Sequence, residues 1–309
     1  MRYFTLPGTG LTVPTVVAGM MRIAEASDAD IRTLVDAAFA AGIRFFDHAD
    51  IYGGAPHHCE TRFAQALRLT PAQREDVVLQ TKCGIVPGVC FDFSRDHIVA
   101  SVDGSLRALR TDYLDVLLLH RPDALVEPDE VARAFDELAG AGKVRAFGVS
   151  NHTPGQLALL QASVRQPLVA NQLQVSITHC PAVAQGIAMN MSGQEQSISL
   201  DVGVLDYCQL HDVTVQAWSP FQSGFFTGVF FGSPDYPELN AVIDRLAGEH
   251  GVTPEAIATA WLLRHPAIGQ VVLGTTTPAR VTAAAAGAEV TLTRAQWYEL
   301  FLAGGHVLP

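Results

Sequence analysis

The chain has 309 residues, of which 49% are hydrophobic and 17% are charged, so it can bury a large core and lacks the polar composition of a disordered segment. Its net charge is −11 and no cluster of Lys and Arg stands out, which excludes nucleic acid as a partner. No run of eighteen apolar residues occurs and the start lacks an apolar stretch of signal-peptide length, so we expect a cytoplasmic protein with no membrane partner.

The chain opens with YFTLPGTGLTVP at 3–14, a predicted β-hairpin that turns around Gly8 to Gly10 and caps the bottom of the fold. Short β-rich runs then recur along the whole chain. Eight of them are predicted strands: 16–19, 44–47, 77–82, 113–120, 144–150, 168–173, 213–218 and 270–274.

Helical patterns with start and stop signals separate these strands. Ser27, Ser94 and Thr153 stand where helix N-caps belong, and Pro128 opens a further helix. Gly42 and Gly142 stand where helices end. The last predicted helix contains TRAQWYEL at 293–300.

Nearly continuous apolar strands that alternate with helices predict parallel βαβ units, and eight such units in this length predict a (β/α)8 TIM barrel forming a single domain over 1–309. A doubly wound sheet is the competing fold, but no strand is followed by GxGxxG and no complete P-loop motif is present. The long irregular stretch 176–200 follows the sixth strand, so we expect it on the face where barrel active sites are built.

Ionisable side chains, which can donate or accept protons, stand at the ends of three consecutive predicted strands. Asp47 ends the second strand, Lys82 the third and His120 the fourth, while Tyr52 lies in the loop after the second. All four meet at one rim if the strands form a barrel. Because Lys and Asp are rarely buried without partners, this arrangement predicts an active site rather than packing alone.

Several motifs in order support one family. FFDHADIYGG at 45–54, VVLQTKCGI at 77–85, SLRALRTDYLDVLLLHRPD at 105–123, AFGVSNHTPGQL at 146–157, NQLQ at 171–174, AWSPF at 217–221 and GTTTPARV at 274–281 resemble the motifs of the aldo-keto reductase superfamily. The resemblance runs from Gly19 to about Arg280. It implies a (β/α)8 fold, NADPH or NADP+ bound without a Rossmann fingerprint, and an Asp47, Tyr52, Lys82 and His120 tetrad that reduces small aldehydes and ketones to alcohols.

The resemblance also implies where the cofactor lies. It assigns Ser150, Asn151 and Gln172 to the carboxamide, Trp218 to the nicotinamide ring, and Ser219, Pro220, Phe221, Ser223 and Gly224 to the pyrophosphate. Gly274, Thr275, Thr276 and Arg280 fall where the family binds the adenosine phosphate, and Gly19, Met20, Met21 and Asp47 complete the set. Arg280 with the hydroxyls of Thr275 and Thr276 can bind a 2′-phosphate, so we expect NADPH to be preferred. Gly274 stands where members with a strong preference for NADPH often have Lys, so NADH remains possible.

The chemistry follows from the residue types. Reduction of a carbonyl needs a proton donor, and a phenol with a pKa of about 10 is a weak acid at neutral pH. Lys82 beside Tyr52 lowers that pKa in this interpretation, Asp47 keeps the ammonium charged, and His120 hydrogen-bonds the substrate oxygen. Loops after the strands form the substrate pocket, for which we expect Ile23, Ile51 and Phe91.

Two alternatives remain open. One is a cofactor-binding regulatory protein with little or no turnover; the other is a barrel lyase or aldolase that uses Lys82 as a Schiff base. The second leaves Trp218 and Arg280 without roles.

We expect no metal, since His57-His58-Cys59-Glu60 are adjacent residues that cannot all face one ion. Glu60 is interpreted as a first-turn charge that favours the helix dipole.

The five cysteines form no CxxC pair, which indicates reduced thiols. We interpret Cys83 as a packing residue.

Overall fold

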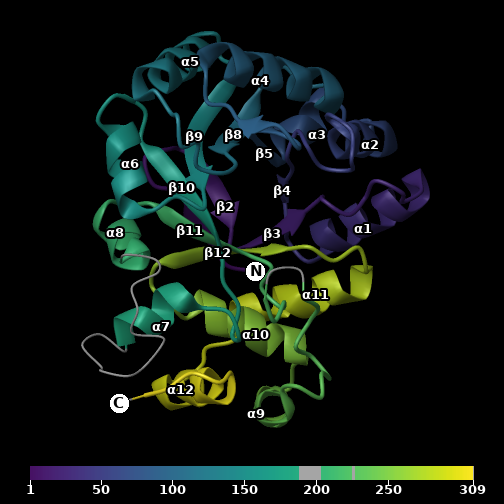
Figure 1. Ribbon diagram of the computed structural model, residues 1–309. Coiled ribbons are helices and arrows are strands. Elements are labelled where there is room, and N and C mark those ends of the chain that lie inside the picture. Colours follow the sequence, from purple (N-terminus) through teal and green to yellow (C-terminus); the bar gives the residue numbers. More distant parts are fainter. Residues whose placement is uncertain (188–202, 225–226, 309) are drawn as a thin grey trace.

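The computed structural model describes residues 1–187, 203–224 and 227–308. Eight parallel strands close into a barrel with helices around it (Figure 1), which confirms the predicted (β/α)8 architecture. Each of the eight predicted runs overlaps one barrel strand. In order around the barrel these are β3 (Val16–Gly19), β4 (Phe45–Asp47), β5 (Val78–Cys83), β8 (Leu114–Leu119), β9 (Val144–Ser150), β10 (Leu168–Gln174), β11 (Thr214–Trp218) and β12 (Ile268–Leu273), which pairs with β3.

Helices cover the outside of the barrel wall. They are α1 (Asp28–Ala40), α2 (His58–Leu67), α3 (Pro71–Glu75), α4 (Arg95–Leu109), α5 (Pro128–Gly140), α6 (Pro154–Gln161), α7 (Pro181–Ile187), α8 (Val204–Leu210), α9 (Pro237–His250), α10 (Pro254–Leu263), α11 (Pro278–Ala286), the 3₁₀ helix η2 (Gly287–Glu289) and α12 (Arg294–Ala303). Within the described ranges, none of these helices combines the length and apolarity needed to cross a bilayer.

The predicted helix signals act as expected. The side chains of Ser27, Ser94 and Thr153 each accept a hydrogen bond from the backbone N–H three residues on, which satisfies a donor that the first helical turn leaves free. Gly42 and Gly142 follow α1 and α5 with φ of 80° and 69°, in the left-handed region that glycine adopts without strain.

The N-terminal hairpin closes the bottom of the barrel. It pairs β1 (Tyr3–Thr5) with β2 (Thr12–Pro14) in antiparallel register, as predicted. Leu6 and Val13 are fully buried and belong to the same apolar cluster as Phe45 and Val116, whose side chains fill the barrel interior. The hairpin thus covers one end of the barrel, and the carboxyl ends of the strands form the opposite rim.

Three further segments complete the description. A small hairpin of β6 (Ile85–Val86) and β7 (Cys90–Phe91), which the sequence did not reveal, extends from the end of β5. Helix α7 lies within the predicted irregular stretch 176–200, whose part from 188 onward falls outside the described residues. The predicted C-terminal helix is α12, and its Trp297 stacks on Trp261 of α10 with the ring centroids 5.0 Å apart.

Candidate active site

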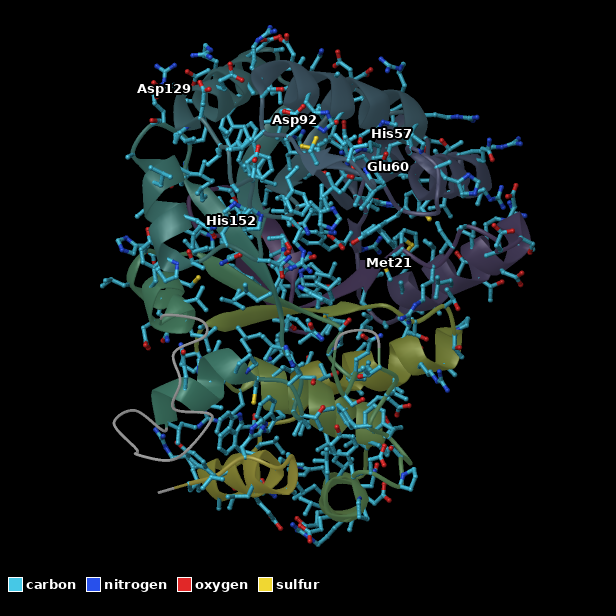
Figure 2. All side chains as sticks on the ribbon, viewed as in Figure 1. Met21, His57, Glu60, Asp92, Asp129 and His152 are labelled. Carbon is cyan, nitrogen blue, oxygen red and sulfur yellow. The ribbon has the colours of Figure 1, made fainter. Side chains whose placement is uncertain are left out.

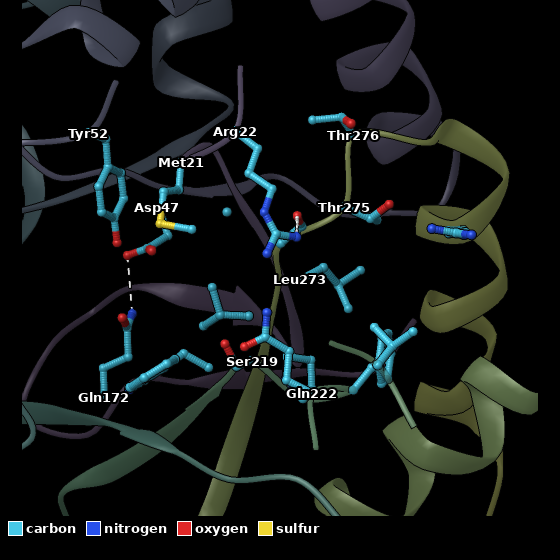
Figure 3. A pocket seen from close by; sticks show the side chains of 18 of the residues that line it. Met21, Arg22, Asp47, Tyr52, Gln172, Ser219, Gln222, Leu273, Thr275 and Thr276 are labelled. Carbon is cyan, nitrogen blue, oxygen red and sulfur yellow. Dashed lines mark hydrogen bonds between the residues drawn. The ribbon is translucent and has the colours of Figure 1, made fainter. Parts of the chain in front are cut away.

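A cavity of about 800 Å³ opens at the carboxyl ends of the strands. Tyr52 and His120 line one part of it, and Thr276 and Arg280 line another. Figure 3 shows Tyr52, Asp47 and Gln172 together at one side and Arg22, Thr275 and Thr276 at the other. The volume lies in the range of small-molecule and cofactor sites.

Lys82 is the centre of the polar cluster at the Tyr52 side. Its ammonium is fully buried and donates to both carboxylate oxygens of Asp47 at 2.8 and 2.7 Å, to the main-chain oxygen of His48 at 2.8 Å and to the hydroxyl of Tyr52 at 3.1 Å. These contacts engage all three ammonium hydrogens. Asp47, Tyr52 and Lys82, three of the four predicted tetrad residues, therefore meet at one point.

The charge states follow from burial and pairing. Burial alone would lower the pKa of Lys82, but Asp47 and Tyr52 outweigh it and the pKa is raised, so the amine is an ammonium without a lone pair for attack on a carbonyl. Burial raises the pKa of Tyr52, and the opposing effect of Lys82 does not cancel it. The expectation that Lys82 brings the phenol pKa below its usual value is therefore wrong for the protein without ligand.

His120 completes the group as a neutral imidazole. Its ring packs edge-on against Tyr52 with the centroids 5.8 Å apart. Burial, reinforced by the charges of Lys82 and Arg121, holds its pKa well below the usual value. A neutral imidazole carries one N–H, so it can donate a hydrogen bond to an oxygen in the cavity without carrying charge there.

A layer of glutamines inside the barrel orients Asp47. Gln80 and Gln172 donate to the same carboxylate oxygen of Asp47 at 2.6 and 3.1 Å, and both also donate to Gln216 at 3.0 Å. Gln216 in turn donates to Gln270, which donates to the main-chain oxygen of Pro14. Because the amide nitrogen of Gln172 is used in this layer, its carbonyl oxygen is left for a donor in the cavity.

Most residues assigned to the cofactor by resemblance line the cavity. They are Gly19, Met21, Asp47, Ser150, Asn151, Gln172, Trp218, Ser219, Pro220, Phe221, Gly274, Thr275, Thr276 and Arg280, together with Ile51 from the expected substrate pocket.

Five of the expected residues lie elsewhere. Met20 and Ile23 are buried in the core, and Phe91 is 46% exposed on the β6–β7 hairpin. Ser223 and Gly224 also do not line this cavity. Ile23 and Phe91 are therefore not pocket walls. Ile23 faces the core, and Phe91 was misplaced because the sequence did not reveal the hairpin that carries it.

The donors of the cavity suit a dinucleotide. Arg22 and Arg280 supply guanidinium groups and Thr275 and Thr276 supply hydroxyls, all groups that bind phosphate oxygens. Gly19 matters sterically, since a Cβ there would lie 2.7 Å from the main-chain oxygen of Leu273. These guanidinium and hydroxyl groups therefore fit the phosphates of a nicotinamide dinucleotide.

Two arginines of the cavity were missed by sequence reasoning. Arg22 follows β3 and donates to the main-chain oxygen of Gly274 at 2.9 Å, although 252 positions separate them. Arg121 follows His120, and its guanidinium lies 5.8 Å from the ring centroid of Trp218. The signal for Arg121 was its place in HRPD directly after a rim residue; no sequence signal joins Arg22 to Gly274.

A second buried polar cluster lies on the outer side of β4 and β5, against α2 and α4. Glu60 is fully buried; it accepts from the Thr81 hydroxyl at 2.5 Å and pairs with His57 at 2.6 Å, beside each other in Figure 2. Burial alone would raise the pKa of Glu60, but these partners lower it. The hydrogen bond to Glu60 raises the pKa of His57. Glu60 is thus an internal ion-pair partner, and its interpretation as a helix-dipole charge was incomplete.

The His57 imidazole occupies a notch at Gly104 of α4, where a Cβ would lie 2.2 Å from its Nε2. Among the described residues, no group of three or more His, Cys, Asp and Glu could hold a metal ion. Cys83 is buried in the core outside the barrel wall.

Comparisons with known proteins agree with this geometry. The profile of the aldo/keto reductase family matches residues 15–300. A 6-dehydroglucose reductase of Agrobacterium fabrum is 36% identical over 304 residues, with 94% of each chain covered, and the oxidoreductase YcsN of Bacillus subtilis is 37% identical with 93% of each covered. A crystal structure of a thermostable aldo-keto reductase has the same fold, with a TM-score of 0.76 over 98% of this chain and all of that one, at 24% identity.

Proposed function

Because the chain belongs to the aldo/keto reductase family, we propose that it uses NADPH to reduce small aldehydes and ketones to alcohols. One observation carries this proposal above the others. The buried ammonium of Lys82 joins Asp47 to the hydroxyl of Tyr52 at the inner end of a cavity that fits a dinucleotide. When bound, the reduced nicotinamide supplies a hydride, and the residues around it must supply the proton.

Tyr52 is the proton donor in this proposal. Its oxygen accepts a hydrogen bond from Lys82, so its own hydroxyl hydrogen is directed to another acceptor, such as a carbonyl oxygen in the cavity. The nearby ammonium stabilises the phenolate that remains after transfer. Neutral His120 donates its N–H to the same oxygen and fixes the carbonyl in place.

The phosphate end determines the choice of dinucleotide. Arg280 has space at the start of α11 beside Thr275 and Thr276 for a forked contact to a 2′-phosphate. A charged hydrogen bond contributes about 1.5 to 3 kcal/mol, or roughly ten- to a hundredfold in affinity. Since Gly274 offers no side-chain cation, we expect a preference for NADPH near tenfold. Titration by tryptophan fluorescence tests it: Arg280→Ala must weaken NADPH more than NADH.

The decisive experiment follows nicotinamide absorbance with NADPH and with NADH over a panel of aldehydes, ketones and quinones. Sugar aldehydes belong in the panel because a relative is named a 6-dehydroglucose reductase. Turnover that requires Tyr52 supports the proposal. Tight NADPH binding without turnover of any carbonyl would instead favour the regulatory cofactor binder, and borohydride trapping of Lys82 on a carbonyl ligand would favour the lyase.

A further inference from the structure

A second cavity of about 430 Å³ adjoins the first at the same rim. Arg121, Asn151 and Trp218 line both cavities, so the two share a wall at the Tyr52 and His120 side of the site. The residues that suit the cofactor phosphates, Arg22 and Arg280, line only the first. The second cavity thus lies away from the phosphate-binding residues and beside His120, since Arg121 follows His120 and the Asn151 amide donates to the main-chain oxygen of His120 at 3.4 Å.

Arg121 brings a positive charge to this shared wall, and no described Asp or Glu forms an ion pair with it. It is half-buried, and its guanidinium forms no hydrogen bond or ion pair with any residue in the described ranges. The guanidinium lies 5.8 Å from the ring centroid of Trp218. The nearby carboxylate of Asp123 is already used by the main-chain N–H groups of Phe93 and Leu125. By contrast, Arg145 on the outer wall forms an ion pair with Asp115 at 2.9 Å.

Gln174 adds a second unmatched donor. It is the last residue of β10, opposite Trp218 in the register of β10 with β11, and it lines the second cavity. Its Nε2 is buried and has no hydrogen-bond partner in the described part of the chain. Buried donors usually have partners, so an unmatched donor on a residue that lines a cavity is available to an acceptor that binds there.

The charge inventory points the same way. No Asp or Glu is among the described residues that line the second cavity. In the first, Asp47 is neutralised by Lys82, which leaves Glu255 as the other carboxylate of its described lining. In this chain with a net charge of −11, Arg121 is thus a cation without an ion-pair partner among the described residues, at the wall that the two cavities share. A group that only accepts hydrogen bonds and carries negative charge complements such donors.

We propose that Arg121 and Gln174 form a subsite for a carboxylate of the substrate, so that the preferred substrates are carbonyl compounds that also carry an acid group. This inference rests on the proposed carbonyl reductase function and specifies its substrate class. Arg121 binds the carboxylate as a charge-assisted donor, and Gln174 fixes its orientation through the amide N–H.

The test compares matched aldehydes with and without the acid: 4-carboxybenzaldehyde against 4-methylbenzaldehyde, and succinic semialdehyde against butanal. The quantity measured is the ratio of kcat/KM for the acid to that for its neutral partner. We expect a ratio above one in the parent protein, a fall of about tenfold in Arg121→Gln, and a smaller fall in Gln174→Leu. Arg133→Gln, which removes a 58% exposed arginine on α5, should keep the parent ratio.

A ratio that is unchanged in Arg121→Gln overturns the subsite. So does a variant that weakens NADPH binding without changing the ratio, because Arg121 would then be a cofactor ligand. If the parent protein reduces no aldehyde, the reductase function fails, and the subsite is tested by binding alone. Tryptophan fluorescence with NADP+ bound then follows titration with 4-carboxybenzaldehyde: a Kd about tenfold weaker in Arg121→Gln supports the subsite, and equal Kd values overturn it.

Discussion

Strands β4 and β5 have two buried polar clusters back to back, and the two are built differently. The inner cluster of Asp47, Lys82, Tyr52 and His120 opens onto the cavity. The outer cluster of Thr81, Glu60, His57 and Asp50 lies between the strands and helices α2 and α4. Both carboxylate oxygens of Glu60 have partners within the fold, Thr81 and His57. Similar residue types therefore serve different ends, and the free hydroxyl hydrogen and imidazole N–H of the inner cluster are what make it suited to chemistry.

The loop between β4 and α2 links the two clusters. The N–H of Asp50 donates to the main-chain oxygen of Lys82 at 3.0 Å, and the N–H of His57 donates to that of Asp50 at 2.5 Å. The N–H of Cys59 donates to the main-chain oxygen of Tyr52. The outer cluster therefore fixes the loop that carries Tyr52. Variants on each side of the strands should separate catalysis from positioning.

The largest effect is expected from Lys82→Met. It leaves the Asp47 carboxylate buried without its counter-charge, which costs about 3 to 5 kcal/mol, and it removes the cation beside Tyr52. Urea denaturation measures the first effect and nicotinamide absorbance the second. Adding Asp47→Asn removes the orphaned charge, so the double variant should regain most of the stability but none of the activity. Recovery of activity in the double variant would contradict the role of Lys82.

Tyr52→Phe should affect chemistry alone. The ring still packs in the pocket, while loss of the proton donor lowers the single-turnover rate by roughly 10² to 10⁴-fold. NADPH affinity, followed by fluorescence, should stay within a few-fold of the parent value. A variant that reduces aldehydes as fast as the parent would remove Tyr52 as the acid.

In the outer cluster, Asp50→Asn should change stability in a pH-dependent way. Burial raises the pKa of Asp50 from an ordinary 3.8 to about 7; the charge of Glu60 adds to this rise, while His57 and Ser101 oppose it. Folding then takes up a proton between these values, so the stability that Asp50 contributes is complete below pH 4 and is lost as pH rises to about 7. Asp50→Asn, which cannot ionise, should exceed the parent in stability at pH 8 by on the order of 3 kcal/mol. An equal difference at pH 4 and pH 8 would contradict the assignment.

Glu60→Gln should have the smallest effect. The substitution weakens the bonds to His57 and Thr81, which contribute about 1.5 to 3 kcal/mol to the stability of the fold. It also loosens the Tyr52 loop indirectly. We expect kcat to fall by no more than about tenfold. Chemical denaturation and steady-state kinetics check both values. A loss of activity as large as that of Tyr52→Phe would mean that the outer cluster takes part in the chemistry.

The sequence predicted those features that depend on strand order. Asp47, Lys82 and His120 end consecutive parallel strands, so the barrel itself brings them together, and local caps such as Ser27 and Thr153 depend only on nearby residues. Contacts between distant side chains were missed. The pairing of Glu60 with His57 and Thr81 requires α2 to lie on β5, and Arg22 meets Gly274 only because β3 closes the barrel beside β12. Phe91 was misplaced because a short hairpin turns it outward.

The pH dependence of the single-turnover reduction rate tests the central claim most directly, because the two clusters offer acids of different strength. The pKa of Tyr52 is raised above its usual value and that of Asp50 is about 7. A general acid must be protonated, so its reaction slows as pH rises through its pKa. If Tyr52 donates the proton, the rate stays constant through neutral pH and declines only in the alkaline range. A decline centred near pH 7 would contradict the account and place the proton donor in the outer cluster.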